Sequence, residues 1–331
     1  MSYCFFKGFF DTIFYARLNL DLAYMESSKK ISEKFEQDIQ NIAKSFIKHF
    51  DKCLSEETND YVLNWIEYVI RLIPPKEREV HFSNGFWKRA PKECWKQIHS
   101  LADKFEYGQD VNPYLSKTVQ NALQGKRTDM LWTDWEICHF HLSENIPNGS
   151  YFSDRSDYLL FAIIGDYFVC FLDARPHPKG AEFADPELYK YICESWPELV
   201  NNLNGVSPDK DWTKEKIHKF RKKGLNVCYS YNGQVKALGG LTTSSGKSIR
   251  SVILKDKITF ELDELSKRLA EYAGKEFNSF SENVFSLKLK KDGVQLYCSL
   301  NDDTTFLDEQ NYPTINCIFN QKWLVEKIFE L

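Results

Sequence analysis

The sequence predicts an α+β protein with a helical N-terminal domain, a small central antiparallel sheet with a packed helix, and a C-terminal α+β domain. Helical periodicity dominates the first 130 residues, and strand-like alternation begins near residue 131. Hairpin and helix patterns are mixed after residue 204. The chain of 331 residues is too long for one ordinary core. We therefore expect domains at 1–130, 131–204 and 205–331.

The clearest helix of the first domain is predicted over residues 28–53. Its apolar residues recur at steps of three and four, which places one stripe toward a core: Ile31, Phe35, Ile39, Ile42, Phe46 and Phe50. A second helix is expected at 60–73, where Pro74 and Pro75 stop it. Further helices are predicted from Pro91 and over 111–125, with one strand at 79–83.

The central segment changes to strands. The stretch WEICHFHLS at 135–143 is strand-like, and the runs at 158–164 and 167–173 predict two strands joined by a tight turn at Gly165–Asp166. A helix is expected from Pro186, with Asp185 as its N-cap. Strand, hairpin and helix together predict a small antiparallel α+β unit.

The third segment mixes helices and hairpins. A basic helix is predicted within 210–223, ending at Gly224, and Asn232–Gly233 indicates a hairpin. Residues 261–274 predict a helix that ends at Gly274, with leucines 262, 265 and 269 on one face. A second hairpin is expected to turn at Asp292–Gly293.

Composition limits the function classes. The net charge of −4 gives no global positive field that would attract nucleic acid, so any such contact needs a local basic patch. Nine cysteines without a CxxC spacing argue against a zinc module or a disulfide framework and favour reduced, mostly buried thiols. No uninterrupted apolar run has spanning length, so we expect a cytoplasmic protein without membrane contact.

A glycine-rich stretch at 239–248, GGLTTSSGKS, has the ending of a phosphate-binding loop. That loop needs four residues between its glycines, whereas Gly240 and Gly246 are separated by five. A flexible Gly/Ser loop is the better interpretation.

Two histidines of the stretch HFH are the strongest candidates for chemistry. Residues two apart in a strand point to one face, so His139 and His141 project together, away from an apolar face. The strand end at 173–180 would bring further polar groups to the same sheet edge, and the segment SDRSDY supplies more: Arg155, Asp157, Arg175, His177 and Lys179.

Three interpretations of this cluster are open. The histidines with Asp173 are of the types that bind zinc, although no carboxylate or cysteine has a diagnostic ligand spacing. A structural role would place them in a packed sheet. The third interpretation is acid–base chemistry on a phosphodiester, for which histidine and arginine are suited.

The basic run at 210–223 is either a solvated helix face or a patch that holds a phosphate backbone beside a catalytic site. In an acidic chain it is the densest positive segment. The residues predicted to contact RNA are Lys179, Lys214, Lys219, Arg221, Lys222 and Lys223.

The stretches HFHLSEN, FSDRSDYLLF and DARPHPK, followed by a helix, resemble the YafO group of toxin endoribonucleases from bacterial toxin–antitoxin systems. The resemblance covers residues 135–200 and implies a RelE-like core that cleaves mRNA at the ribosome without a metal or another cofactor. This chain departs from the family in the sequence Ala174–Arg175–Pro176–His177 and in the large regions on both sides.

Residue by residue, the resemblance implies a site of His139, His141, Arg155, Asp157 and His177. RNA is cut when its 2′-hydroxyl attacks the adjacent phosphate, which needs a base, an acid and a cation. His139 or His141 would be the base and His177 the acid. Arg155 and Arg175 would stabilise the phosphate.

The expected function is thus a toxin-like endoribonuclease in growth control or phage defence, with RNA, the ribosome and an antitoxin as partners. A non-enzymatic antitoxin-like or regulatory binding protein that keeps an interferase-like fold is the alternative, and the acidic net charge favours it.

Overall fold

The computed structural model describes residues 3–51, 60–127, 129–143, 145–206, 212–237, 239–276 and 284–329, with the side chains of 3–23 and 274–276 left out of the description. The start of the predicted basic run, at 210–211, and the end of the first predicted helix, at 52–53, lie outside these ranges. The chain forms two compact units. Unit 1 combines residues 1–53, 59–62 and 254–331, and unit 2 contains 54–58 and 63–253. The α+β class is confirmed.

These two units differ from the three predicted segments, because both predicted boundaries, at 130/131 and 204/205, fall inside unit 2. The 204/205 boundary is crossed by the pairing of residues 201–202 with 236–237, and the 130/131 boundary is crossed by another strand pairing. β1 (Glu79–Phe82), predicted within the helical segment, pairs in parallel with the second strand of the central hairpin. The helical and central segments therefore share a sheet, which sequence periodicity alone does not reveal.

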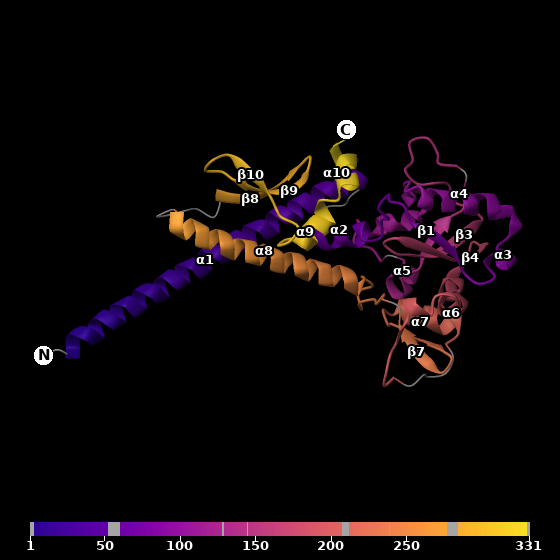
Figure 1. Cartoon of the computed structure of the whole chain (residues 1–331), viewed down its shortest axis with the longest axis horizontal. Helices are drawn as coiled ribbons and strands as arrows, with labels where there is room; N and C mark the ends of the chain where they lie inside the picture. The colour runs from indigo at the N-terminus through magenta and orange to yellow at the C-terminus, as the bar shows by residue number, and fades with distance from the viewer. Residues whose placement is uncertain are drawn as a thin grey trace. The chain divides into compact units, whose positions relative to one another are not determined.

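Unit 2 is built on a four-stranded sheet of order β1–β4–β3–β2 (Figure 1). Its other strands are β2 (Cys138–His141), β3 (Tyr158–Ile164) and β4 (Phe168–Pro176), and these three pair antiparallel as predicted. The predicted turn at Gly165–Asp166 connects β3 to β4. The pairing of these two strands shifts register between Phe161 and Ala162. The sheet as a whole is mixed because β1 is parallel.

Helices pack around this sheet. Apart from the first turn of a long helix that continues into unit 1, the described α-helices of unit 2 are α2 (Tyr61–Val69), α3 (Phe86–Arg89), α4 (Trp95–Glu106), α5 (Met130–Trp135), α6 (Pro186–Ser195) and α7 (Lys214–Lys222). α6 begins as predicted, since the Asp185 carboxylate accepts a hydrogen bond from the Glu187 amide at 3.0 Å. α7 is followed by Gly224 at φ +68°, which suits the predicted helix end.

Residues 111–125 form 3₁₀ turns rather than the predicted α-helix. The 3₁₀ segments of unit 2 are η1 (Lys92–Cys94), η2 (Asn112–Tyr114), η3 (Lys117–Ala122), η4 (Gly180–Ala184) and η5 (Pro197–Leu199). η3 is capped by Ser116, whose hydroxyl accepts a hydrogen bond from the Thr118 amide. These tight turns lie beside the candidate site described below.

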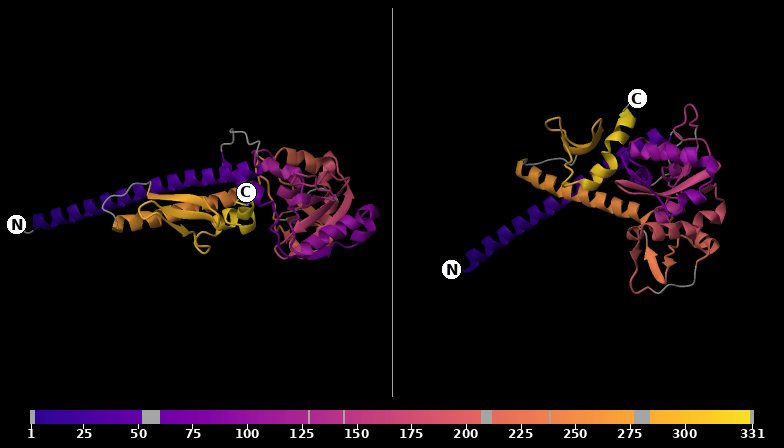
Figure 2. Two further views of the ribbon diagram at one scale, coloured as in Figure 1. Left: turned by 90° about the horizontal axis from the view of Figure 1, so that it is seen from above. Right: turned by 45° about the vertical axis from the view of Figure 1, so that its right-hand side comes forward.

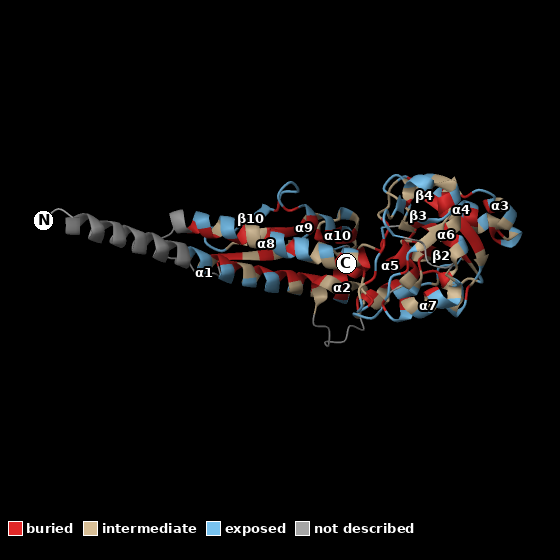
Figure 3. Ribbon diagram, turned by 90° about the horizontal axis from the view of Figure 1, so that it is seen from below, coloured by how far each residue is buried: buried red, intermediate tan, exposed pale blue. Residues whose placement is uncertain are grey.

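The core of unit 2 lies between the sheet and its helices, and Figure 3 shows the strands as mostly buried. One buried cluster joins Trp135 of α5, Phe161 of β3 and Leu188 of α6, all with at most 2% of their surface exposed. Burial of such side chains contributes roughly 1.5–3 kcal/mol each. α6 therefore fixes the hairpin that carries part of the site.

A second, smaller sheet of unit 2 has the order β5–β7–β6. Its strands are β5 (Asn201–Asn202), β6 (Tyr229–Tyr231) and β7 (Gln234–Ala237). Asn232 and Gly233 connect β6 and β7 with φ of +50° and +71°, which confirms the predicted hairpin.

Unit 1 packs a three-stranded sheet of order β10–β9–β8 against long helices (Figure 2). Its elements are α1 (Tyr3–Phe50), α8 (Ile249–Glu276), β8 (Phe285–Lys290), β9 (Gly293–Cys298), β10 (Asp303–Phe306), α9 (Pro313–Phe319) and α10 (Lys322–Phe329). The predicted stripe of α1 is buried from Ile31 to Phe46. The carboxylate of Asp38 accepts a hydrogen bond from the Leu287 amide of β8 at 2.9 Å.

Three sequence details of the C-terminal region need correction. α8 begins at Ile249 and continues past Gly274 to Glu276, because flanking residues extend the same helix. The predicted hairpin pairs Lys290 with Gly293, so Lys291 and Asp292 form its turn.

The end of the glycine-rich stretch is hydrogen-bonded to the carboxylate of Glu67. Glu67 accepts a hydrogen bond from the Ser248 amide at 2.6 Å, and it also contacts the Ser251 hydroxyl. A carboxylate thus lies where a phosphate-binding loop would need an anion, which supports the prediction against a nucleotide site. The seven cysteines with described side chains are free thiols, and four of them are buried. None of the described helices is both long and apolar enough to cross a membrane.

Candidate active site

β2 turns both histidines of the HFH stretch to one face. It pairs with β3 so that His139 lies opposite Phe161 and His141 opposite Leu159. Phe140, between them, is fully buried and packs edge-on against Phe105 of α4. Strand alternation therefore aims the two imidazoles away from this apolar contact, as the sequence predicts.

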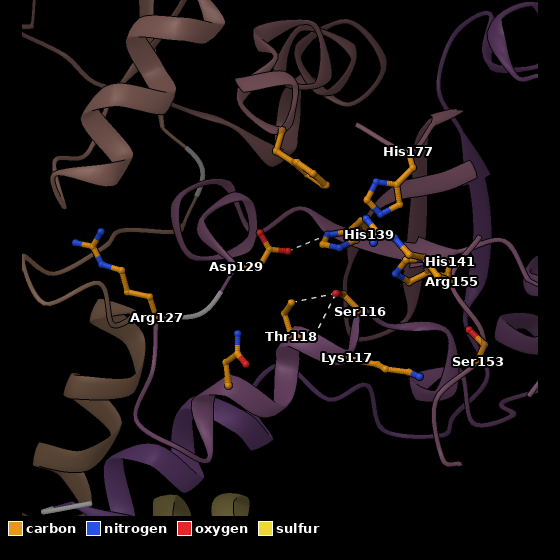
Figure 4. Close-up of a pocket in the computed structure, with 12 residues that line it drawn as sticks. Ser116, Lys117, Thr118, Arg127, Asp129, His139, His141, Ser153, Arg155 and His177 are labelled. Carbon is orange, nitrogen blue, oxygen red and sulfur yellow. Dashed lines mark hydrogen bonds and ion pairs between the residues drawn. The ribbon is translucent and has the colours of Figure 1, made fainter. Parts of the chain in front are cut away.

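The two imidazoles line a pocket of about 640 Å³ within unit 2 (Figure 4). His177, directly after β4, joins them, with its ring centroid 5.7 Å from that of His141. The centroids of His139 and His141 are 6.4 Å apart. Phe183 of η4 adds an apolar wall. The remaining lining residues are Ser116, Lys117, Thr118, Asn121, Arg127, Asp129, Ser153 and Arg155.

His139 is paired with a buried carboxylate. Asp129 caps α5 by accepting a hydrogen bond from the Leu131 amide at 2.9 Å, and its second oxygen lies 2.8 Å from Nδ1 of His139. The contact is an ion pair by distance, although this nitrogen makes no hydrogen bond of regular geometry with a described residue. Burial alone would raise the pKa of Asp129, but His139, Arg71 and the Leu131 amide outweigh it and lower the pKa.

His141 is held as a neutral imidazole. Its Nδ1 accepts a hydrogen bond from the Ser156 amide at 3.3 Å, which places the ring proton on Nε2. Burial lowers the pKa of His141 to about 4, and electrostatic interactions with His139, His177, Arg155 and Lys117 act in the same direction.

His177 has the opposite tautomer. Its Nδ1 lies 3.0 Å from the carbonyl oxygen of Pro178, which only accepts, so this nitrogen donates and Nε2 carries the lone pair. The backbone amide of His177 donates to the Asp157 carbonyl at 2.7 Å, which fixes the strand end. The half-buried ring packs near Phe183.

Cationic side chains lie around the three imidazoles. Lys117 and Arg155 are exposed, and neither forms an ion pair with a residue that the structure describes. Arg127 contributes to the lining, but its guanidinium donates to the Lys222 carbonyl at 2.7 Å. Figure 4 shows that group directed away from the histidines. Arg155 and Lys117 are therefore the cations available to an anionic ligand.

Two predicted site residues lie outside the pocket lining. The side chain of Asp157 is exposed, and this residue supports His177 through its backbone. Arg175 donates to Asp173 at 2.9 Å and to Asp185 at 2.7 Å, at the N-terminus of α6. Because both carboxylates already bind the Arg175 guanidinium, this placement does not support the prediction that Arg175 stabilises the phosphate of RNA.

The predicted RNA-binding residues differ in how far they are exposed to solvent. Arg221 is 3% exposed and pairs with Asp134 at 2.7 Å, so it is a buried structural cation and not part of an exposed patch. The side chains of Lys179, Lys219, Lys222 and Lys223 are exposed, and Lys214 is half-buried. None of these predicted contacts lines the pocket.

The metal interpretation finds no support in the described ranges, where no group of three or more His, Cys, Asp or Glu side chains is placed to hold a metal ion. Asp173, its proposed carboxylate, is engaged by Arg175. Asp129, Lys117 and Phe183 line the pocket but were not predicted from the sequence. Only the N-cap position of Asp129 before an apolar helix was visible in sequence, and the other two are brought in by tertiary folding.

Comparisons of this chain with protein-family models, with curated proteins and with solved structures find no match.

Proposed function

We propose that unit 2 is a metal-independent endoribonuclease that cleaves mRNA by attack of the 2′-hydroxyl on the adjacent phosphate. One observation carries the proposal: three imidazoles with different polar partners line one pocket together with Arg155, which forms no ion pair with a described residue. These are the groups that this reaction needs.

The reaction uses one base and one acid. The base removes the proton of the 2′-hydroxyl, the 2′-oxygen bonds to phosphorus, and the bond from phosphorus to the 5′-oxygen breaks. The acid gives a proton to the leaving 5′-oxygen. The products are a 2′,3′-cyclic phosphate and a free 5′-hydroxyl, so no external reactant is consumed.

The partners of each ring suggest its task. The lone pair on Nε2 of His177 makes this residue the base. His139 contacts the Asp129 carboxylate through Nδ1, and we assign it as the acid. This assignment reverses the one expected from sequence, because the contacts of the Pro178 carbonyl and Asp129 with histidines are visible only in the folded structure.

His141 acts as a neutral donor. Its Nδ1 is occupied by the Ser156 amide, so its Nε2–H is the group left to donate to a phosphate oxygen. Its pKa of about 4 keeps it neutral at pH 7. Arg155 and Lys117 supply the positive charge that stabilises the developing dianionic phosphorane.

The cellular role follows from the resemblance to the YafO group. The antiparallel β2–β3–β4 arrangement with α6 packed on it is compatible with a RelE-like core, and the parallel strand β1 is an addition. On this basis the enzyme is a cytoplasmic toxin of a toxin–antitoxin or phage-defence system, acting on ribosome-associated mRNA and restrained by an antitoxin.

The test compares the wild-type chain with His139→Ala, His141→Ala and His177→Ala during induced expression and in vitro. We expect growth arrest and loss of mRNA with the wild type, and loss of cleavage by about 10²-fold or more for His139→Ala and His177→Ala. Products should carry 2′,3′-cyclic phosphate ends, and EDTA should leave the rate unchanged.

His81→Ala is the matched control, since His81 lies on β1 in the same unit and outside the pocket. It should cleave like the wild type. Intact RNA with the wild-type chain would refute the nuclease and favour the non-enzymatic binding protein. Loss of activity in EDTA would point to a metal enzyme.

A further inference from the structure

We propose that a second pocket, which shares His141 with the first, binds the neighbouring backbone phosphate of a single-stranded RNA substrate. This inference rests on the proposed ribonuclease function and names where the strand continues. The second pocket has a volume of about 280 Å³. It is lined by Lys96, Gln97, Ser100, Leu101, Lys104, Tyr114, His141, Leu142 and Ser143.

The two pockets share one residue. His141 lines both of them, at the end of β2, and Leu142 and Ser143 continue from it into the second pocket. A strand whose reacting phosphodiester lies beside His141 therefore has an adjacent cavity for its next nucleotide. The shared imidazole connects the two pockets.

The lining of the second pocket suits an anion. α4 contributes two lysines, Lys96 and Lys104, and hydroxyl and amide groups accompany them. Lys104 is half-buried, with Nζ 3.2 Å from Oε1 of Gln109 and 5.8 Å from the ring centroid of Tyr114. No carboxylate lines this pocket among the described residues. Two lysines in the lining of one cavity favour a phosphate.

Tyr114 adds a surface for the nucleotide that carries this phosphate. Its ring is half-buried and lines the same cavity. Aromatic rings stack on bases without sequence preference. The pocket thus offers both interactions that a single-stranded nucleotide provides. The strand would then run along α4, in contrast to the basic helix α7 expected from sequence.

The experiment uses the full chain and three double variants with equal loss of charge. Lys96→Gln/Lys104→Gln alters the second pocket, Lys219→Gln/Lys223→Gln alters α7, and Lys190→Gln/Lys236→Gln alters two lysines outside both regions. Binding is measured with a mixed-sequence 12-nucleotide DNA, which lacks the attacking 2′-hydroxyl and is not cleaved by this route. Cleavage is measured with a 12-nucleotide RNA and with ribodinucleotides, which have one phosphodiester.

We expect the α4 variant to bind the DNA about tenfold more weakly. The slope of its plot of log affinity against log salt should become shallower by about 0.7, the value for one neutralised phosphate on a single strand. Its KM for the 12-nucleotide RNA should rise while ribodinucleotide cleavage stays at the wild-type rate. Lys96→Arg/Lys104→Arg should restore binding, and the Lys190/Lys236 variant should bind like the wild type.

Unchanged DNA binding in the α4 variant, or weakening in the α7 variant instead, would overturn the inference. An equal loss for ribodinucleotides and long RNA would also overturn it, because the lysines would then act at the reacting phosphate. If the wild-type chain binds the DNA through α4 but cleaves no RNA, the ribonuclease proposal fails while the phosphate site stands. If only the second-pocket inference is wrong, the α4 variant binds DNA like the wild type and the wild-type chain still cleaves RNA.

Discussion

Two carboxylates of one short segment, five residues apart, have opposite electrostatic outcomes. Asp129, at the start of α5, faces the pocket and contacts His139, Arg71 and the Leu131 amide. Asp134, within α5, is buried against Arg221 at 2.7 Å. The pKa of Asp129 is lowered, whereas burial raises the pKa of Asp134 despite its partner.

The difference teaches that the number of partners decides the state of a buried carboxylate. Asp134 has a single arginine, and burial also lowers the pKa of that Arg221 guanidinium. Such a pair recovers only part of its desolvation cost, so its role is structural. Asp129 has three partners that all favour the anion, so it remains charged where an imidazole needs a counter-charge.

The largest effect is expected from breaking the structural pair. Asp134→Ala leaves the buried guanidinium of Arg221 without its counter-charge, which should cost about 3–5 kcal/mol of unfolding free energy. Urea denaturation of the purified chain measures this loss. Asp134→Leu/Arg221→Met, which removes both charges, should recover most of it. A double variant as unstable as the single one would show that the pair itself stabilises unit 2.

The next effect concerns activity. Asp129→Asn keeps an N-cap for α5 but removes the charge beside His139, so cleavage should fall about 10²-fold with KM little changed. Stability should fall by about 2 kcal/mol, less than for Asp134→Ala. Single-turnover cleavage together with urea denaturation separates the two effects. A rate equal to the wild type would remove Asp129 from the mechanism.

A smaller effect should appear in the pH dependence of stability. The pKa of His141 is lowered from 6.5 to about 4, so between these values the unfolded state binds more protons than the folded one. The His141 contribution is complete above pH 6.5 and is lost as the pH falls toward 4. It amounts to roughly 2 kcal/mol after allowance for solvent screening. His141→Gln should flatten the stability curve between pH 5 and 6.5, measured by urea denaturation at each pH.

The smallest effect is expected at the exposed lysines of α7. Lys219→Ala and Lys222→Ala should each change the unfolding free energy by less than about 0.5 kcal/mol, although they flank Arg221. Thermal denaturation is sufficient to check this. A loss as large as that of Asp134→Ala would show that the helix contributes more than its buried arginine.

Local patterns predicted the elements of the fold. The alternation around Phe140 placed both histidines on one face, and the Asn232–Gly233 pair marked a hairpin. The parallel pairing of β1 with β4 was not predictable, because a four-residue strand carries no information about a partner about ninety residues away.

Only the part of the site that lies in short local motifs could be predicted from the sequence. His139, His141, His177 and Arg155 meet in one pocket, and each is visible in a short motif. The carboxylate of Asp129 and the cation of Lys117 come from other segments, so their contribution depends on tertiary packing. Arg175 lies in a predicted site motif, but its guanidinium binds Asp173 and Asp185 and does not line the pocket.

Unit 1 is built from segments at both ends of the sequence, which affects the order in which the two units can fold during synthesis. The stripe of α1 from Ile31 to Phe46 is buried with residues from β8 onward, and Phe46 packs against Phe319 of α9. A ribosome makes residues 63–253 in between, as one continuous stretch. Because domains fold as units during translation, the pocket can form while α1 still lacks its partners. If unit 2 has the proposed nuclease activity, any restraint on it during synthesis must therefore act before unit 1 is complete.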